Sequence, residues 1–139
     1  MKNKFSTVWK SSRKIKKHRK YRVNAPLHIK HKMLASHLSK ELRKKYNKRA
    51  ISLRKGDSIK VMRGEFRGKE GKVALVDTKK RKVFIEGIQK SRKDGTKVNV
   101  RFEPSKLMIT ALNLDDKKRV KSLERHIGIK TKGTEVGGK

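Results

Sequence analysis

The middle of the chain alternates apolar and polar residues with a period of two. This alternation, which begins near Ser58, predicts five short strands. They are expected at residues 58–63, 72–77, 82–86, 97–102 and 107–112. No segment between them is long enough for a helical crossover, so they predict a small antiparallel barrel or a curled sheet.

The apolar positions of these strands define an expected core. Asp94-Gly95 predicts a turn between the third and fourth strands, and Pro104 ends the fourth. A core of this size gives only modest stability by itself. The expected core residues are Ile59, Val61, Val73, Val76, Val83, Ile85, Val98, Val100, Leu107, Ile109 and Leu112.

Helical patterns flank the strands. Ser39 is the expected N-cap of a helix over KELRKKY, residues 40–46, which Asn47 would end. Its apolar stripe would hold Leu38, Leu42 and Tyr46. A short helical turn is expected over residues 27–35. After the strands, LDDKKRVKSLER predicts a surface helix opened by two aspartates, and the last ten or so residues are expected to be loose.

Glycines punctuate the hairpin at residues 56–77. Glycine permits a positive φ and lets the backbone approach a neighbouring surface closely. The run GEFRGKEG lacks the GK[ST] ending of a nucleotide-binding loop and lies between strands, so turns explain it better. Gly64, Gly68 and Gly71 are therefore the expected hairpin glycines, and basic residues lie between them.

Positive charge dominates the composition and is unevenly distributed. The 139 residues carry a net charge of +31, with 40% charged and 32% hydrophobic residues. Residues 1–55 hold 20 Lys/Arg and one acid, residues 56–112 hold 15 and 7, and residues 113–139 hold 8 and 4. We expect a basic extension, a domain and a tail with these boundaries. Such a charge calls for a polyanionic partner. Nucleic acid is favoured over a membrane, because no apolar run could span one and no basic segment has a wide apolar face.

The segment at residues 12–22 has no hydrophobic periodicity, and alone it is expected to be disordered. Two interpretations are open: a solubilising or nuclear-import run, or an extension that folds along RNA. The second is favoured because basic residues are spread over the whole extension. The N-terminus lacks the apolar stretch of a secretory signal and is interpreted as part of the mature protein.

Catalytic and metal-binding chemistry find no support in the sequence. Cysteine is absent, and no serine, threonine or acid pair occurs in a recognisable catalytic setting. His28 and His31 lie in an HIKH run, but no ligand-rich cluster accompanies them. We expect no enzyme activity, no metal, no cofactor and no homo-oligomer.

The expected RNA contacts are mostly basic residues directed at phosphates. Trp9, Tyr21 and Phe66 could each stack a base, whereas Phe84 and Phe102 are expected to be buried or half-buried. The candidate RNA-binding residues are Arg13, Lys14, Lys16, Lys17, His18, Arg19, Lys20, Tyr21, Arg22, Asn24, Lys30, His31, Lys32, Arg43, Lys44, Lys48, Arg49, Arg54, Lys55, Arg63, Phe66, Arg67, Lys69, Lys72, Lys79, Lys80, Arg81, Lys82, Lys90, Arg92 and Lys93.

The hairpin resembles the KOW motif, a short RNA-associated β element. With the runs YRVNAPLHIKHKMLASHLSKELRKKYNKRAISLRKGD, VMRGEFRGKEGKV, VFIEGI and EPSKLMITALNLDDKKR in that order, the chain is similar to a KOW-domain family of the large ribosomal subunit. This is the universal family twenty-four, whose eukaryotic form is twenty-six. The resemblance covers roughly residues 19–125, and the segments before the strands look archaeal or eukaryotic.

The resemblance implies a mainly β fold: an SH3-like barrel with a long basic N-terminal extension containing a short helix, and a short helical tail. It also implies a structural role on the cytoplasmic ribosome, binding of the 5′ domain of large-subunit ribosomal RNA, help in early subunit assembly and a place near the peptide tunnel exit. Expected partners are this RNA, neighbouring ribosomal proteins and nascent-chain factors. Glu103 stands where the family commonly has histidine, so an RNA contact there is in question.

Two other functions would account for parts of the sequence. A transcription elongation factor also uses KOW barrels, but it usually places an α/β domain before the barrel, where this chain has a basic extension. A nonspecific DNA-condensing protein would be explained by charge alone and would not require the hairpin glycines. Sedimentation with large ribosomal subunits would separate these alternatives.

Overall fold

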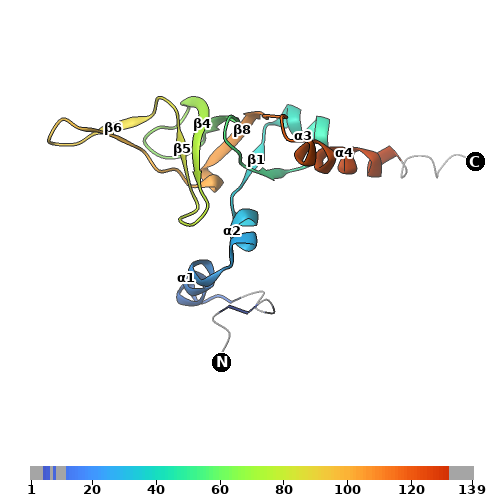
Figure 1. Cartoon of the computed structure of the whole chain (residues 1–139), viewed down its shortest axis with the longest axis horizontal. Helices are drawn as coiled ribbons and strands as arrows, with labels where there is room; N and C mark the ends of the chain where they lie inside the picture. Colours follow the sequence, from blue (N-terminus) through green and yellow to red (C-terminus); the bar gives the residue numbers. More distant parts are fainter. Residues whose placement is uncertain (1–4, 7, 9–11, 132–139) are drawn as a thin grey trace, which may run out of the picture.

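A six-stranded sheet with helices at both chain ends forms the molecule (Figure 1). The computed structural model describes residues 5, 6, 8 and 12–131, with side chains described through residue 125. Within these residues it contains four α-helices, the six-stranded sheet and a separate two-stranded sheet. The fold is therefore mixed α/β, whereas the sequence predicted a mainly β protein.

The sheet is mixed because one strand pair is parallel. β1 runs parallel to β8, and the other paired neighbours are antiparallel. The edge strands of the described sheet are β2 and β5, so no closed barrel is formed within the described residues. In spatial order the strands are β2 (Ala50–Ser52), β1 (Ala35–Leu38), β8 (Leu107–Ala111), β3 (Ser58–Val61), β4 (Glu70–Asp77) and β5 (Lys82–Ile85).

The predicted strands are confirmed in place, with ends that differ by a few residues. The sequence missed β6 (Gln89–Ser91) and also β1 and β2, which lie in the basic extension. β1 and β2 were missed because pairing with other segments, and not a local alternation, makes them strands. Leu38 consequently belongs to β1, not to the helix stripe in which it was predicted. Residues of the extension therefore contribute directly to the sheet.

A second hairpin stands apart from the sheet (Figure 1). β6 (Gln89–Ser91) pairs with β7 (Lys97–Asn99) and with no other strand of the described chain, and every residue of both strands is exposed. Gly95, with φ +80°, confirms a turn at the predicted place, but the turn joins β7 to β6, a strand that was not predicted, and not to the predicted strand at residues 82–86. Val98 was predicted to be in the core, but it is 37% exposed because its strand has no sheet to cover it.

The core lies between the strands and the segments that flank them. Apart from Val98, the predicted members are confirmed: most are buried, and Val76, Val100 and Leu112 are partly buried and packed against the buried ones. Leu34 and Leu53 join the core from the extension, next to β1 and β2. The sheet is therefore stabilised by residues on both sides of the predicted boundary at residue 55.

Helix α3 (Lys40–Tyr46) has the predicted ends. The Leu42 backbone N–H donates to the Ser39 hydroxyl at 3.3 Å, which caps the N-terminus. Asn47 adopts a left-handed conformation with φ +50°, which ends the helix. Tyr46 is buried and Leu42 packs against the core, so this face anchors the short helix.

Two helices form an arm that projects from the sheet (Figure 1). The first, α1 (Ile15–Asn24), occupies a segment for which no regular structure was predicted; the second, α2 (Leu27–Met33), was predicted. Neither helix contains a buried residue. Ala25, with ψ 133°, has the extended backbone expected before Pro26, and this break separates the helices.

Helix α4 (Lys117–Thr131) begins where two aspartates were expected to open it. The Asp116 carboxylate accepts the Lys118 backbone N–H at 2.9 Å. The predicted surface helix is nevertheless docked, because Arg119 and Leu123 are only 4% and 1% exposed. The prediction that the last ten or so residues are loose concerns mainly residues 132–139, which lie outside the described residues.

Candidate nucleic-acid interface

The β3–β4 hairpin presents cations on a tightly closed loop. The Val61 and Gly68 N–H groups donate to the carbonyls of Lys69 and Val61, each at 2.9 Å. Gly64 and Gly68 have φ values of +98° and +88°, as turn glycines should. These bonds fix the path of the loop. Its exposed cations are Arg63, Arg67 and Lys69, followed by Lys72 on β4.

Gly71 has a different role from the two turn glycines. It lies within β4, opposite Ile59, and has no positive φ. A Cβ added there would lie 2.7 Å from Ile85 Cγ2 and 3.0 Å from the Glu86 carbonyl oxygen. The absence of a side chain at Gly71 therefore lets β4 and β5 approach each other.

Phe66 is half-buried at the hairpin and packs against the core. Its ring meets Phe102 edge-on at 5.9 Å between centroids, and Lys69 Nζ lies 5.2 Å from the ring centre. Phe102 is buried and Phe84 is half-buried, as predicted. Phe66 thus supports the hairpin from the protein side, and its stacking on a base stays a prediction. Trp9 lies outside the described residues.

The arm carries the densest group of exposed cations. In α1 and the residues before it, His18, Tyr21 and Asn24 are half-buried and the other candidates are exposed. In α2, Lys30 is half-buried, whereas His31 and Lys32 are exposed. Because neither helix has a buried residue, most of these side chains lie on accessible faces. The exposed candidates of α1 and the residues before it are Arg13, Lys14, Lys16, Lys17, Arg19, Lys20 and Arg22.

Some predicted contact residues also make bonds within the protein. Lys48 Nζ donates to the Ser122 carbonyl at 2.9 Å, and burial followed by the nearby Arg125 lowers its pKa. Arg43 Nε donates to the Leu38 carbonyl at 2.8 Å. Arg54 forms an ion pair with Asp116. Lys44, Arg49 and Lys55 are exposed on or beside these elements.

The β4–β5 turn adds a third basic group. Lys79 and Lys80 are exposed, and Asp77 accepts the Lys80 N–H at 2.9 Å. Arg81 is half-buried with a positive φ of 55°. Lys82 pairs with Glu103 at 3.0 Å, so the acid that raised a question about RNA binding is neutralised from within the protein.

The projecting hairpin adds a fourth group, formed by Lys90, Arg92 and Lys93, which are exposed. Lys90 Nζ lies 3.3 Å from Glu65 Oε2, and both side chains of this ion pair are exposed. Such a surface pair contributes little to stability. The hairpin therefore extends the distribution of positive charge beyond the edge of the sheet.

His37 was not predicted as a site residue, although arginines surround it. Burial lowers its pKa most, and the positive charges of Arg43, Arg49 and Arg63 lower it further. Its position on β1 brings together charges from α3, the segment before β2 and the β3–β4 loop. The sequence did not indicate this grouping, because it depends on how α3, the segment before β2 and the β3–β4 loop fold around β1.

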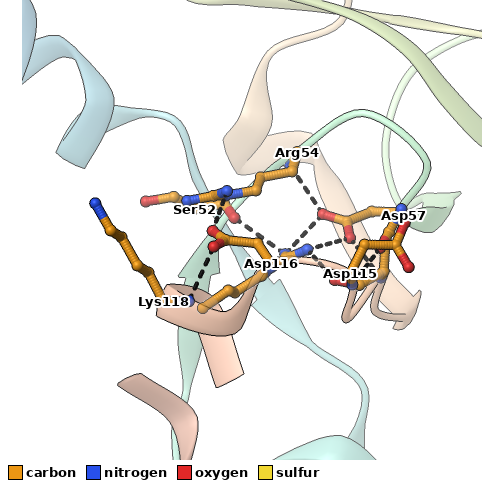
Figure 2. A network of polar contacts seen from close by, with 8 residues as sticks. Ser52, Arg54, Asp57, Asp115, Asp116 and Lys118 are labelled. Atoms are coloured by element: carbon orange, nitrogen blue, oxygen red, sulfur yellow. Dashed lines mark hydrogen bonds and ion pairs between the residues drawn. The ribbon is translucent and has the colours of Figure 1, made fainter. Parts of the chain in front are cut away.

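A buried ion pair ties α4 to the sheet (Figure 2). Arg119 binds Asp57 through two bonds, of 2.6 Å and 2.8 Å, and both side chains are almost fully buried. The Asp57 carboxylate also accepts the backbone N–H groups of Arg54 and Asn113 at 2.8 Å and 2.9 Å. This pair was not predicted, because its members are separated by 62 positions and have no local signature.

The described residues contain no group of three or more histidine, cysteine, aspartate or glutamate side chains suited to a metal ion. Among the same residues, no helix is both long and apolar enough to span a membrane. What remains is a set of cationic surfaces on separate elements, with the chemistry to contact phosphates at several points.

Comparison with known proteins gives consistent matches. The model of the family that comprises the ribosomal proteins L26 of eukaryotes and L24 of archaea matches residues 12–126. The chain is 47% identical over 114 residues to large ribosomal subunit protein uL24 of Korarchaeum cryptofilum (strain OPF8), covering 82% of this chain and 87% of that protein. It is 40% identical over 116 residues to uL24 of Methanosphaera stadtmanae, covering 84% and 99%.

Proposed function

This chain belongs to the family of eukaryotic L26 and archaeal L24 ribosomal proteins, and on that premise we propose that it binds large-subunit ribosomal RNA by contacting several RNA segments at once. It is a non-enzymatic protein of the large subunit of the cytoplasmic ribosome. The finer proposal concerns how the protein performs this structural role.

One observation carries the proposal: exposed cations occur on four separate elements. These are the arm, the β3–β4 loop, the β4–β5 turn and the β6–β7 hairpin. Lysines and arginines on separate elements would neutralise phosphates of different RNA segments. Simultaneous contacts would reduce the repulsion between those segments and fix their packing. This is an assembly role that requires no catalytic group.

We propose that the RNA partner is the 5′ domain of the large-subunit ribosomal RNA, that binding occurs early in subunit assembly, and that the protein lies near the peptide tunnel exit. Support comes from the match across residues 12–126, which includes the whole KOW-like hairpin and the basic extension from residue 12 onward. Neighbouring ribosomal proteins and nascent-chain factors are the proposed protein partners.

We further propose that the curled sheet corresponds to the SH3-like barrel of KOW proteins. The β3–β4 pairing and the close approach at Gly71 support this assignment. We also propose that the chain has three functional parts: an extension (residues 1–55), a domain (residues 56–112) and a tail (residues 113–139). In this view the extension both completes the sheet through β1 and β2 and carries the arm.

Salt dependence tests this proposal. Binding of the full chain to purified large-subunit ribosomal RNA would be measured across a range of monovalent salt. Neutralisation of several phosphates predicts a steep linear fall of log affinity with log salt, about 0.7 to 0.9 per phosphate contact. In a parallel experiment the protein should sediment with large subunits after a moderate salt wash. A nearly flat salt dependence would contradict the proposal.

A further inference from the structure

A cleft separates the arm from the sheet. It has a volume of about 490 Å³, within the range of about 300–1,000 Å³ typical of small-ligand sites. Figure 1 shows the β4–β5 turn extending toward the side on which α1 and α2 lie. Its lining includes Tyr21 and Arg22 of α1, Met33 at the end of α2, Lys80 and Arg81 of the turn, and Glu103.

Positive charge is in excess within this lining. Arg22 comes from α1, whereas Lys80 and Arg81 come from the β4–β5 turn. Glu103 is the acid in the lining, and its hydrogen bond from Lys82 Nζ lowers its pKa most, with Lys106 contributing less. Because this carboxylate is already balanced by two lysines, the other cations leave the cleft suited to an anion.

Arg81 is held in an unfavourable state. Its φ of +55° lies in the left-handed region, where an ordinary side chain costs about 1–2 kcal/mol. Its Nη1 lies 3.5 Å from Met33 Sδ, a weak acceptor, and its Nε is buried with no hydrogen-bond partner. A buried donor left without an acceptor is also unfavourable. Strain at a residue that lines the cleft, together with a guanidinium nitrogen held by a weak thioether acceptor, points to a ligand.

Tyr21 gives the cleft an aromatic wall. Its ring lies 4.7 Å from the Phe5 ring, centroid to centroid, so an aromatic pair stands at the arm side. A free phosphate would need the cations but would gain nothing from this wall. A nucleotide uses both, because its phosphate accepts from guanidinium groups and its base packs on aromatic rings.

We propose that the cleft between α1 and the β4–β5 turn binds a single nucleotide of the ribosomal RNA, with its phosphate at Arg81 and its base beside Tyr21. The inference rests on the proposed function and names one point of contact within it. The bound nucleotide would join arm and sheet, and its phosphate would offer Arg81 Nη1 a stronger acceptor than the Met33 thioether.

A substitution that separates folding from binding tests the proposal. Arg81→Asn suits a left-handed turn better than arginine and removes the buried unpartnered donor, so the melting temperature should stay equal or rise. Affinity for purified large-subunit ribosomal RNA should nevertheless fall by about tenfold, the loss expected for a charge-assisted hydrogen-bond pair. Arg81→Lys keeps the charge without the guanidinium donors and should recover only part of the affinity.

Lys79→Gln is the matched control. It removes one positive charge from the same turn, but Lys79 is exposed and does not line the cleft. It therefore measures the effect of one unspecific charge, which should be clearly smaller than the effect of Arg81→Asn. Equal losses in the two variants would overturn the proposal.

Ultraviolet cross-linking of assembled large subunits gives an independent result. Mass spectrometry of digested subunits should find a nucleotide adduct on the peptide containing Tyr21, and Arg81→Asn should reduce its yield. A second outcome is that subunits contain the protein and give adducts at other residues but none at Tyr21. That result would overturn the proposal that the cleft binds a nucleotide, and it would leave the proposed function standing. Failure of the protein to bind ribosomal RNA at all would overturn both.

Discussion

The two ends of the chain are helical, but they are held very differently. Helix α4 is docked through a bidentate pair between two buried side chains and through the buried Leu123. The arm helices α1 and α2 contain no buried residue, although they carry more of the candidate contacts. The comparison teaches that one end of the chain is built into the fold, whereas the other end leaves its cations on exposed helices that are available for the proposed RNA contact.

The docking of α4 is specific because Asp57 is fully satisfied. Its carboxylate receives two guanidinium bonds and two backbone N–H bonds (Figure 2). The Arg54 N–H is local, whereas Asn113 and Arg119 are 56 and 62 positions away. Arg119 also donates to the carbonyls of Asn113 and Ser52, at 2.8 Å and 3.2 Å. One ion pair thus joins β2, the β2–β3 connection, the segment after β8 and the start of α4.

The largest expected effect on stability is from Arg119→Ala. It leaves the buried Asp57 carboxylate without its partner, which should lower the free energy of unfolding by about 3–5 kcal/mol. Urea denaturation of the free protein measures this loss. Arg125→Ala, at an exposed position of the same helix, is the control and should have little effect. Equal stability of the two variants would show that α4 is not locked to the sheet.

Gly71→Ala should have the next largest effect. The added Cβ would lie 2.7 Å from Ile85 Cγ2, so β4 and β5 would have to move apart. Overpacking of this kind costs about 1–3 kcal/mol. Denaturation of Lys72→Ala, at the exposed neighbouring position of β4, provides the comparison. A Gly71 variant as stable as this control would refute the close approach at β4.

A smaller effect is expected from pH. Burial and three arginines lower the pKa of His37 in the folded protein below its ordinary value of 6.5. The unfolded chain then binds the proton more readily, so this contribution to stability is present above pH 6.5 and is lost as the pH falls. His37→Gln should flatten the stability curve between about pH 7.5 and 5.5, measured by denaturation at each pH. An unchanged slope would contradict the lowered pKa.

The smallest effect on stability is expected from the double variant Arg19→Gln, Lys20→Gln. Both residues are exposed on α1, so the unfolding midpoint should not change. The slope of log affinity against log salt should become shallower by about 0.7 to 0.9 for each phosphate that the variant no longer neutralises. An unfolding midpoint that drops with an unchanged salt slope would reverse the roles assigned to arm and sheet.

Local signals predicted much of this molecule. Ser39 and Asn47 marked the ends of α3, and alternation in the central segment located its strands, because caps and periodicity depend on neighbouring residues. The short strands β1 and β2 were missed because their pairing, not their composition, makes them strands. Val98 was misassigned because alternation cannot tell whether a hairpin has a sheet to cover it.

The candidate site was predictable in kind but not in arrangement. Composition indicated which residues carry positive charge, and the glycines located the β3–β4 loop. The cleft at Arg81 and the pair of Asp57 with Arg119 join distant parts of the chain, and the arginines around His37 come from three separate elements. A single sequence does not indicate such contacts, because they depend on how the folded sheet brings separate segments of the chain together.

Amide hydrogen exchange, measured on the free protein and on the same protein in large subunits, tests the division between sheet and arm most directly. In the free protein, the amides of β3, β8 and the first turns of α4 should be protected together, whereas those of α1 and α2 should exchange fast. In the subunit, α1 and α2 should become protected. Protection of α1 equal to that of α4 in the free protein, or unprotected arm helices in the subunit, would contradict the account.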